Sequence, residues 1–403
     1  MIATFSEKSK QFIKKYFWEG QKLEEDQRIE KSTEEEISWD RKILTKYRRL
    51  IGLAIPALFF EIIWWSLAIR WNLFALFPTR YFMSITMIFG ALVAGMTSEG
   101  GGAVAFPVMT LAFHIQPDVA RDFSLMIQSC GMTAAAFTIF WMRLKLEWRS
   151  VIFCTLGGGL GLILGLEFVA NHVPPAVKKM FFVSVWASFA CALFLLNRRK
   201  KRQTFDQIPN FGWWKAGILL AIGAVGGLFT SLAGSGIDIC SFSILTLLFM
   251  VSEKVATPTS VVLMGINTVV GFYWRQLMMD GTSQEAWNYF AVCVPVVVIC
   301  APLGSLISSH FHRQTLAGLV YLLELVALVS GFVIVRPAWP LALASCAMLL
   351  GGSIVFYVVS RVGLWLAGRE AGLTKSTATT ATTTAASTTP SPSVTIISVN
   401  GSG

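Results

Sequence analysis

The sequence predicts an all-α polytopic membrane protein with two inverted repeats, each a broken re-entrant helical hairpin plus three transmembrane helices, with extra flanking helices. Three observations predict this fold: an apolar composition, stretches long enough to cross a bilayer, and an internal repeat interrupted by glycines. Hydrophobic residues make up 54% of the 403 residues and charged residues 14%. About a quarter of residues are charged in soluble proteins, so most of this chain is expected to lie in lipid.

Several stretches have the length of a membrane-spanning helix, which needs roughly 20 apolar residues to cross about 30 Å. They include residues 151–170, 180–196, 316–335 and 340–359. The charged segment 1–50 has no secretory signal and is expected to form a cytoplasmic N-terminal arm. Residues 51–81 are then the first transmembrane helix and its loop.

Motifs of enzymes and of metal or nucleotide sites do not occur in the sequence. The seven cysteines and four histidines have no metal-ligand spacing, and no phosphate-binding loop is present. We therefore expect no cofactor, no bound metal and no enzymatic activity. The basic run Arg198–Arg202 directly follows an apolar span, which favours a cytoplasmic loop over nucleic-acid binding.

The chain repeats itself when Gly100 is placed over Gly236, a shift of 136 residues. A repeat of this kind predicts two homologous halves, residues 82–196 and 216–335, joined by a basic cytoplasmic linker at 197–215. Identities in this register fall at Phe106/Phe242, Thr110/Thr246, Leu111/Leu247, Phe113/Phe249, Val119/Val255, Ala120/Ala256, Ser124/Ser260 and Gly90/Gly226.

Each half opens with an apolar stretch that glycines interrupt, at 97–102 in the first half and 234–238 in the second. Glycine breaks helices, so residues 83–96 with 103–113, and 217–233 with 239–251, are expected to form pairs of short helices that meet inside the membrane. If both pairs turn back, the basic loops fall on the cytoplasmic side, as the positive-inside bias requires. The result is eight full spans and two re-entrant hairpins, and only Lys178 and Lys179 oppose it.

The C-terminal part beyond the repeats is predicted to hold one more transmembrane helix, at 336–369, and a disordered Thr/Ser-rich tail, at 370–403. Both termini are expected in the cytoplasm. The sequence indicates a multi-pass protein of the plasma membrane or an organelle membrane. It leaves open whether the protein forms a homodimer.

Exposed backbone is tolerated at membrane depth only around a protein-lined or water-filled site, so the two breaks are expected to converge. Helix starts near Ala103 and Ile239 would direct unpaired N–H groups at an anion. The alternative is that the glycines only allow tight helix packing. The candidate substrate-binding residues are Thr97, Ser98, Gly100, Gly101, Gly102, Gly234, Ser235, Gly236, Gln128 and Asn267.

These motifs resemble those of the TauE/SafE sulfite exporter family, whose halves each carry a glycine-rich element, a proline and an Ala-x-x-Thr-Ser-like element. In the first half, Ser98–Gly102, Pro107 and Ala120–Ser124 match; in the second, Gly234–Asp238 and Ala256–Ser260 match. The resemblance implies transport of sulfite, organosulfonates or related sulfur oxyanions, coupled to an ion gradient. Ser98 and Glu99 depart from the family pattern, and the second copy lacks two glycines and its proline.

Acidic residues at this depth are costly unless they are neutralised or paired. Glu99 and Asp238 are therefore candidates for coupling transport to a proton or sodium, and capping of the following half-helices is the alternative role. Arg121 and Asp122 are expected to form a local pair or an interface anchor. Further acids lie in apolar spans, namely Glu61, Glu167 and Glu324.

The functional hypothesis is a secondary transporter of small anions that works by alternating access. One alternative is a membrane scaffold or receptor without transport, which would need no convergent site, and another is a carrier for a different anion such as a carboxylate.

Overall fold

The computed structural model describes residues 47–97, 101–197, 204–279, 281–308, 311 and 313–387. These residues are nearly all helical, and the only β-type pairing reported among them is an isolated bridge between Phe205 and Val251. Ten of the helices are long and apolar enough to cross a membrane. The predicted fold class, an all-α polytopic membrane protein, is confirmed.

The long helices, in chain order, are α4 (Arg48–Trp71), α5 (Phe77–Met96), α7 (Pro117–Trp141), α8 (Trp148–Leu164), α9 (Pro175–Asn197), α10 (Trp213–Ala233), α12 (Glu253–Tyr273), α13 (Gln284–Ser308), α14 (Arg313–Val335) and α15 (Trp339–Ser387). The short elements at the two breaks are α6 (Gly102–Pro107) with the π-helical η3 (Val108–Ala112), and α11 (Ile237–Ser243) with the π-helical η6 (Ile244–Leu248). Two further π-helical turns, η4 (Gly165–Val169) and η7 (Trp274–Met278), continue α8 and α12.

The first broken element folds back on itself as a hairpin. At its closed end, a Cβ built on Gly90 of α5 would lie 3.5 Å from Val104 of α6. At its open end, the rings of Phe82 and Phe113 are 4.5 Å apart. The chain therefore returns to the end of the molecule from which α5 started.

The second broken element has the same form. A Cβ on Gly226 of α10 would lie 2.7 Å from the Cα of Ile237, and the rings of Trp214 and Phe249 are 6.4 Å apart. The first arms are longer than expected from the sequence: α5 has 20 residues and α10 has 21. Each hairpin thus joins an arm of spanning length to a short returning arm.

The open ends of the two hairpins lie at opposite ends of α7. Residue Asp118 at the start of α7 binds Lys178 at the start of α9, near the open end of the first hairpin, where Lys179 donates to the carbonyl of Thr110. At the other end of α7, Trp141 exchanges hydrogen bonds with Arg48. The loop after α7 then contacts the linker before α10 through Lys145 and Asp206.

Glycines bring α8 and α10 into direct backbone contact. A Cβ on Gly157 would lie 2.0 Å from the carbonyl oxygen of Leu220, and one on Gly161 would lie 2.0 Å from that of Ala224. Small residues permit this approach between membrane helices, where no hydrophobic drive favours association. Tight packing is therefore one role of glycine in this chain, in the spans between the breaks.

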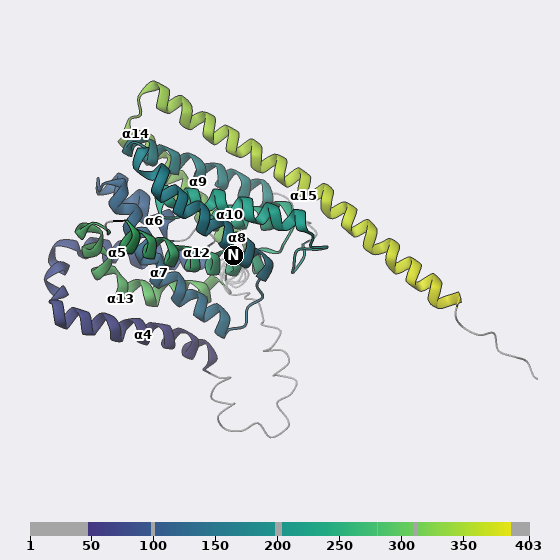
Figure 1. Cartoon of the computed structure of the whole chain (residues 1–403), viewed down its shortest axis with the longest axis horizontal. Coiled ribbons are helices and arrows are strands. Elements are labelled where there is room, and N and C mark those ends of the chain that lie inside the picture. The colour runs from purple at the N-terminus through teal and green to yellow at the C-terminus, as the bar shows by residue number, and fades with distance from the viewer. Residues whose placement is uncertain are drawn as a thin grey trace, which may run out of the picture.

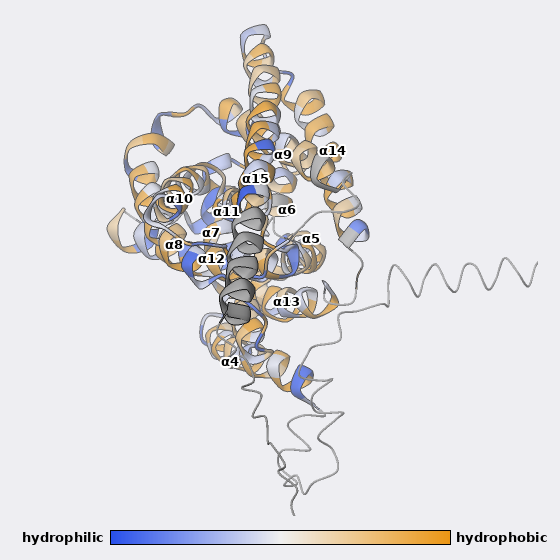
Figure 2. Cartoon of the chain, turned by 90° about the vertical axis from the view of Figure 1, so that its right-hand side faces the viewer, coloured by the Kyte–Doolittle hydropathy of each residue, from blue (hydrophilic) through white to orange (hydrophobic). Residues whose placement is uncertain are grey.

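The helices α4 and α15 lie on opposite flanks of the bundle, with the hairpins between them (Figure 1). Apolar residues predominate along the helices (Figure 2), and many large apolar side chains are exposed, as expected for contact with lipid. The helix α15 continues past Arg369 to Ser387, into the segment for which the sequence predicts disorder. Residues 388–403, like the arm before residue 47, lie outside the described residues.

Candidate functional site

The two glycine-rich breaks meet in the middle of the bundle. A Cβ built on Gly102, at the first break, would lie only 2.5 Å from the Cβ of Ser235 at the second. Gln128 of α7 joins them: its Nε2 donates to the carbonyl of Gly234 at 2.8 Å, and its side chain lies beside both Gly101 and Gly102. The convergence that the sequence predicts is therefore present in the structure.

The second break requires glycine on conformational grounds. Gly234 ends α10 with φ +77°, and Gly236 has φ +154°, conformations that residues with a side chain rarely adopt. Asp238, in the first turn of α11, accepts hydrogen bonds from the backbone N–H of Gly236 at 2.9 Å and from the hydroxyl of Ser235 at 3.0 Å. Both of its oxygens thus satisfy donors of the break itself. A first-turn acid that accepts from the N–H of the N-cap residue, here Gly236, resembles one half of a capping box.

The first break is described only in part. Thr97 ends α5, is buried, and donates its hydroxyl to the carbonyl of Val93 at 2.9 Å. Gly101 is buried beside Gln128 with ordinary spacing, since its Cβ would lie 3.5 Å from Gln128 Cγ. Ser98, Glu99 and Gly100 lie outside the described residues, so their predicted roles stay predictions.

Three buried polar atoms near the second break have no hydrogen-bond partner in the described part of the chain. They are Ser124 Oγ, Gln128 Oε1 and Asn267 Oδ1. The Oγ of Ser124 would lie 3.4 Å from a Cβ on Gly234. Asn267 lies on the other side, where a Cβ on Gly158 would approach both Asn267 Oδ1 and the side chain of Ile237. Buried polar groups are normally paired, so these atoms can serve a polar ligand.

A buried ion network lies next to the breaks and joins the two halves of the chain. Arg121 and Asp122 form the local pair expected from the sequence, at 2.8 Å. Asp122 also binds Arg275 of η7, in the second half, at 2.8 Å. Because a Cβ on Gly234 would lie 2.8 Å from the carbonyl oxygen of Arg121, this network begins directly beside the second break.

The same network extends to the start of α9. Asp118 Oδ1 binds Arg121 at 3.0 Å and also binds the ammonium of Lys178, whose side chain is only 2% exposed. Lys178 and Lys179 oppose the topology predicted from charge, yet both are engaged by groups of the protein here. The sequence analysis did not single out Arg275, although a lone arginine in the apolar stretch 255–279 is itself a signal of an intramembrane partner.

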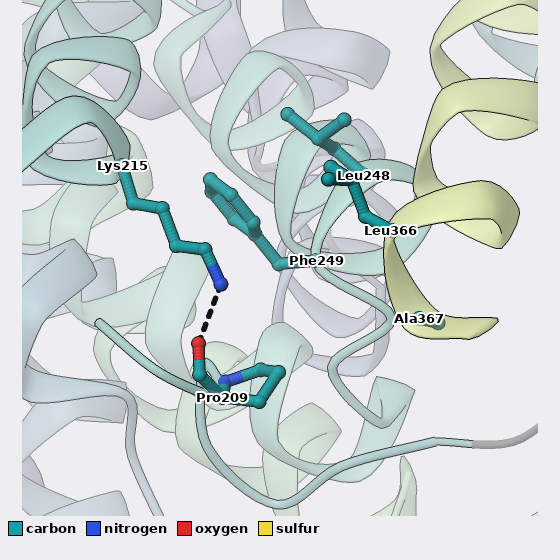
Figure 3. Close-up of a pocket in the computed structure, with 6 residues that line it drawn as sticks. All are labelled: Pro209, Lys215, Leu248, Phe249, Leu366 and Ala367. Carbon is teal, nitrogen blue, oxygen red and sulfur yellow. Dashed lines mark hydrogen bonds between the residues drawn. The ribbon is translucent and has the colours of Figure 1, made fainter. Parts of the chain in front are cut away.

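A separate small pocket lies at the open end of the second hairpin (Figure 3). Lys215 at the start of α10 donates to the carbonyl of Pro209 in the linker, and its ammonium also lies 5.8 Å from the ring centre of Phe249. Leu366 and Ala367 of α15 close the other side. These contacts tie the linker and α15 to the base of the hairpin, at a distance from the breaks.

The chain was compared with families of known proteins, with curated proteins and with solved structures. No curated protein and no solved structure matches it. The family model described as Sulfite exporter TauE/SafE matches residues 82–331, which include both hairpins and the network between them. Since this match covers more than half of the chain, the multi-pass membrane protein described here belongs to the TauE/SafE sulfite exporter family.

Proposed function

We propose that the protein is a secondary carrier of small sulfur oxyanions, such as sulfite or organosulfonates, and that it binds them where the hairpin tips meet. The observation that carries this proposal is the contact of Gly102 with Ser235 and of Gln128 with Gly234. A scaffold or receptor would need no such convergence of two glycine-rich breaks.

The polar groups around the hairpin tips can bind an oxyanion through a few directional hydrogen bonds. The hydroxyl of Ser124 has no partner in the described part of the chain and can donate to a substrate oxygen. Gln128 Oε1 can only accept, and a protonated oxyanion such as bisulfite brings an O–H for it. Backbone N–H groups at the start of α6 add a positive field, whereas at the start of α11 the N–H groups of Gly236 and Ile237 already bind Asp238 and Thr230.

The way in which the hairpins enter supports a mechanism of alternating access. Their open ends lie at opposite ends of α7 and their tips touch, which is the arrangement that inverted repeats would produce. In this proposal the substrate separates the tips, and each hairpin in turn opens a path to one side. The termini are cytoplasmic in this scheme, as the positive-inside bias predicts.

Ion coupling completes the proposal, with a proton or sodium moving in the same cycle. Glu99 and Asp238 are the candidates at the breaks. The hydrogen bonds of Asp238 to Ser235 and Gly236 support its alternative role as a cap, because a carboxylate that satisfies two fixed donors is held in place.

The test is flux through proteoliposomes that contain the purified full-length protein. Sulfite, sulfoacetate, taurine, sulfate and acetate are compared, each with and without an imposed proton gradient. We expect flux of one or more sulfur oxyanions that the gradient accelerates. Flux of acetate alone would favour a carboxylate carrier, and no flux above that of empty liposomes for any anion would favour a scaffold.

A further inference from the structure

The helix α14 carries one buried acid in the centre of an otherwise apolar face. Glu324 is 2% exposed, midway along Arg313–Val335. The other inward residues of this face are small or aliphatic, and they follow helical spacing. They are Ala317, Val320, Ala327 and Gly331.

This face packs into a seam formed by α9 and the returning arm of the first hairpin. Within the seam α14 contacts α9, α6 and η3. A Cβ on Gly331 would lie 3.0 Å from the side chain of Val183, and the rings of Tyr321 and Phe194 are 6.1 Å apart. The two helices are therefore antiparallel, and Glu324 is level with residues 190 and 191 of α9.

The carboxyl of Glu324 lacks the compensation that Glu167 and Asp238, two other described acids of the membrane region, have. Its Oε2 has no hydrogen-bond partner in the described part of the chain. By contrast, Glu167 accepts a hydrogen bond from Trp274 Nε1 at 2.7 Å, Asp238 is bound through both oxygens, and Glu61 is partly exposed on α4. An ionised carboxylate is strongly disfavoured in such a seam, and a neutral carboxylic acid is tolerated.

No charged group of the described elements packed against α14 neutralises Glu324. The elements α6 and η3 hold no titratable residue. On α9, Cys191 is level with Glu324 but its side chain is exposed. Lys178 and Lys179 are about eleven or more residues away along α9, roughly 17 Å or more, and bind Asp118 and the carbonyl of Thr110.

We propose that the carboxyl of Glu324 is the proton-binding site that couples anion transport to the proton gradient, an inference that rests on the proposed carrier function. Sodium is a poor fit, because a hard cation needs several oxygen ligands and the inward side chains nearest to Glu324 along α14 are those of Val320 and Ala327, which offer none. The site binds H⁺ as the neutral acid when the seam is closed. It releases H⁺ to water when the seam opens.

The seam includes α6 and η3 of the first hairpin, so this hairpin can connect substrate binding at its tip with proton binding at Glu324. Phe106 of α6 lies 4.9 Å from Phe182 of α9, and Phe182 stacks on Trp186 at 4.1 Å between ring centres. The indole N–H of Trp186, on α9, also has no partner in the described part of the chain. Movement of the first hairpin during substrate exchange therefore changes the packing, and with it the hydration, of the seam in which Glu324 lies.

The test compares Glu324→Gln with Glu167→Gln as the matched control. Both replace an intramembrane carboxyl by an amide of the same size, and the amide at residue 167 can still accept from Trp274. In proteoliposomes, Glu324→Gln should lose accumulation driven by a pH gradient and retain exchange at equal substrate concentrations. The control should retain both. Accumulation that persists in Glu324→Gln would overturn the proposal.

A second readout does not depend on transport. Infrared difference spectra of the purified full-length protein, recorded between acidic and alkaline buffer, should show a carboxylic acid C=O band that Glu324→Gln lacks and Glu167→Gln keeps. A band unchanged in Glu324→Gln would also overturn the proton site. If the band disappears while the wild-type protein moves no anion, the proton site stands and the proposed carrier function fails.

Discussion

The contact between the two breaks leads to a sharp prediction for Gly102→Ala. The added Cβ would lie 2.5 Å from the Cβ of Ser235, about 1 Å closer than the ~3.5 Å of an ordinary carbon contact. Rotation cannot relieve this overlap, because both atoms are bound directly to backbone. Overpacking of this kind costs roughly 1–3 kcal/mol. If the closed arrangement of the tips lies on the transport path, about 2 kcal/mol slows each passage roughly 30-fold.

The assay is the initial rate of sulfite uptake into proteoliposomes, normalised to protein inserted and paired with thermal unfolding in detergent. Gly159→Ala is the matched control, because a Cβ there would meet no atom within 4 Å and the residue lies within α8, away from the breaks. The double variant Gly102→Ala/Ser235→Gly removes the clashing atom and should regain rate relative to Gly102→Ala. Equal rates for the Gly159 and Gly102 variants, or no recovery in the double variant, would refute the reasoning.

Three further predictions concern the ion network, the cap and the topology. Arg275→Met should lower the free energy of unfolding by about 3 kcal/mol, because it breaks a buried ion pair. Lys145→Met, which breaks an exposed pair, should lower it by only about 0–1 kcal/mol. Equal losses for the two variants in thermal unfolding would contradict a buried network. Asp238→Asn should lower the thermal unfolding temperature, since one of the two donors of the break loses its acceptor; an unchanged temperature would argue against a cap. In a cysteine-free background, a cysteine at Ala75 should react with an impermeant reagent added outside and one at Lys200 should not, and the reverse pattern would overturn the topology.

The sequence was sufficient to predict the class of fold and the meeting of the two breaks. Both follow from features that repeat along the chain: spans of bilayer length, and glycines at corresponding places in two halves. The long first arms were not predicted. The prediction started the arms at residues 83 and 217, whereas α5 begins at Phe77 and α10 at Trp213, so that each has the length of a full span.

The local pair of Arg121 and Asp122 was predicted, but side-chain partners on separate helices could not be, because they depend on the register between helices distant in the chain. The bond from Arg275 to Asp122 joins residues 153 positions apart, and the bond from Gln128 to Gly234 joins residues 106 apart. For Asp238, the sequence left two roles equally open, and only the positions of Ser235 and Gly236 add weight to the cap. The sequence likewise placed Glu324 in a span without indicating which side of the helix it occupies.

The repeated halves do not give the two ends of the molecule the same chemistry. At the open end of the first hairpin, buried charges hold the two halves together through Asp122 and Arg275. At the open end of the second hairpin the ion pair of Lys145 with Asp206 is exposed, with side chains 57% and 63% accessible, and Glu147 accepts from the backbone N–H of Ile208. Separating a buried ion pair costs more than separating an exposed one, which water already screens. In the proposed cycle the end of the molecule at the open side of the first hairpin is therefore the harder one to open. The seam around Glu324 contains part of this hairpin, so proton release from Glu324 is suited to accompany this opening.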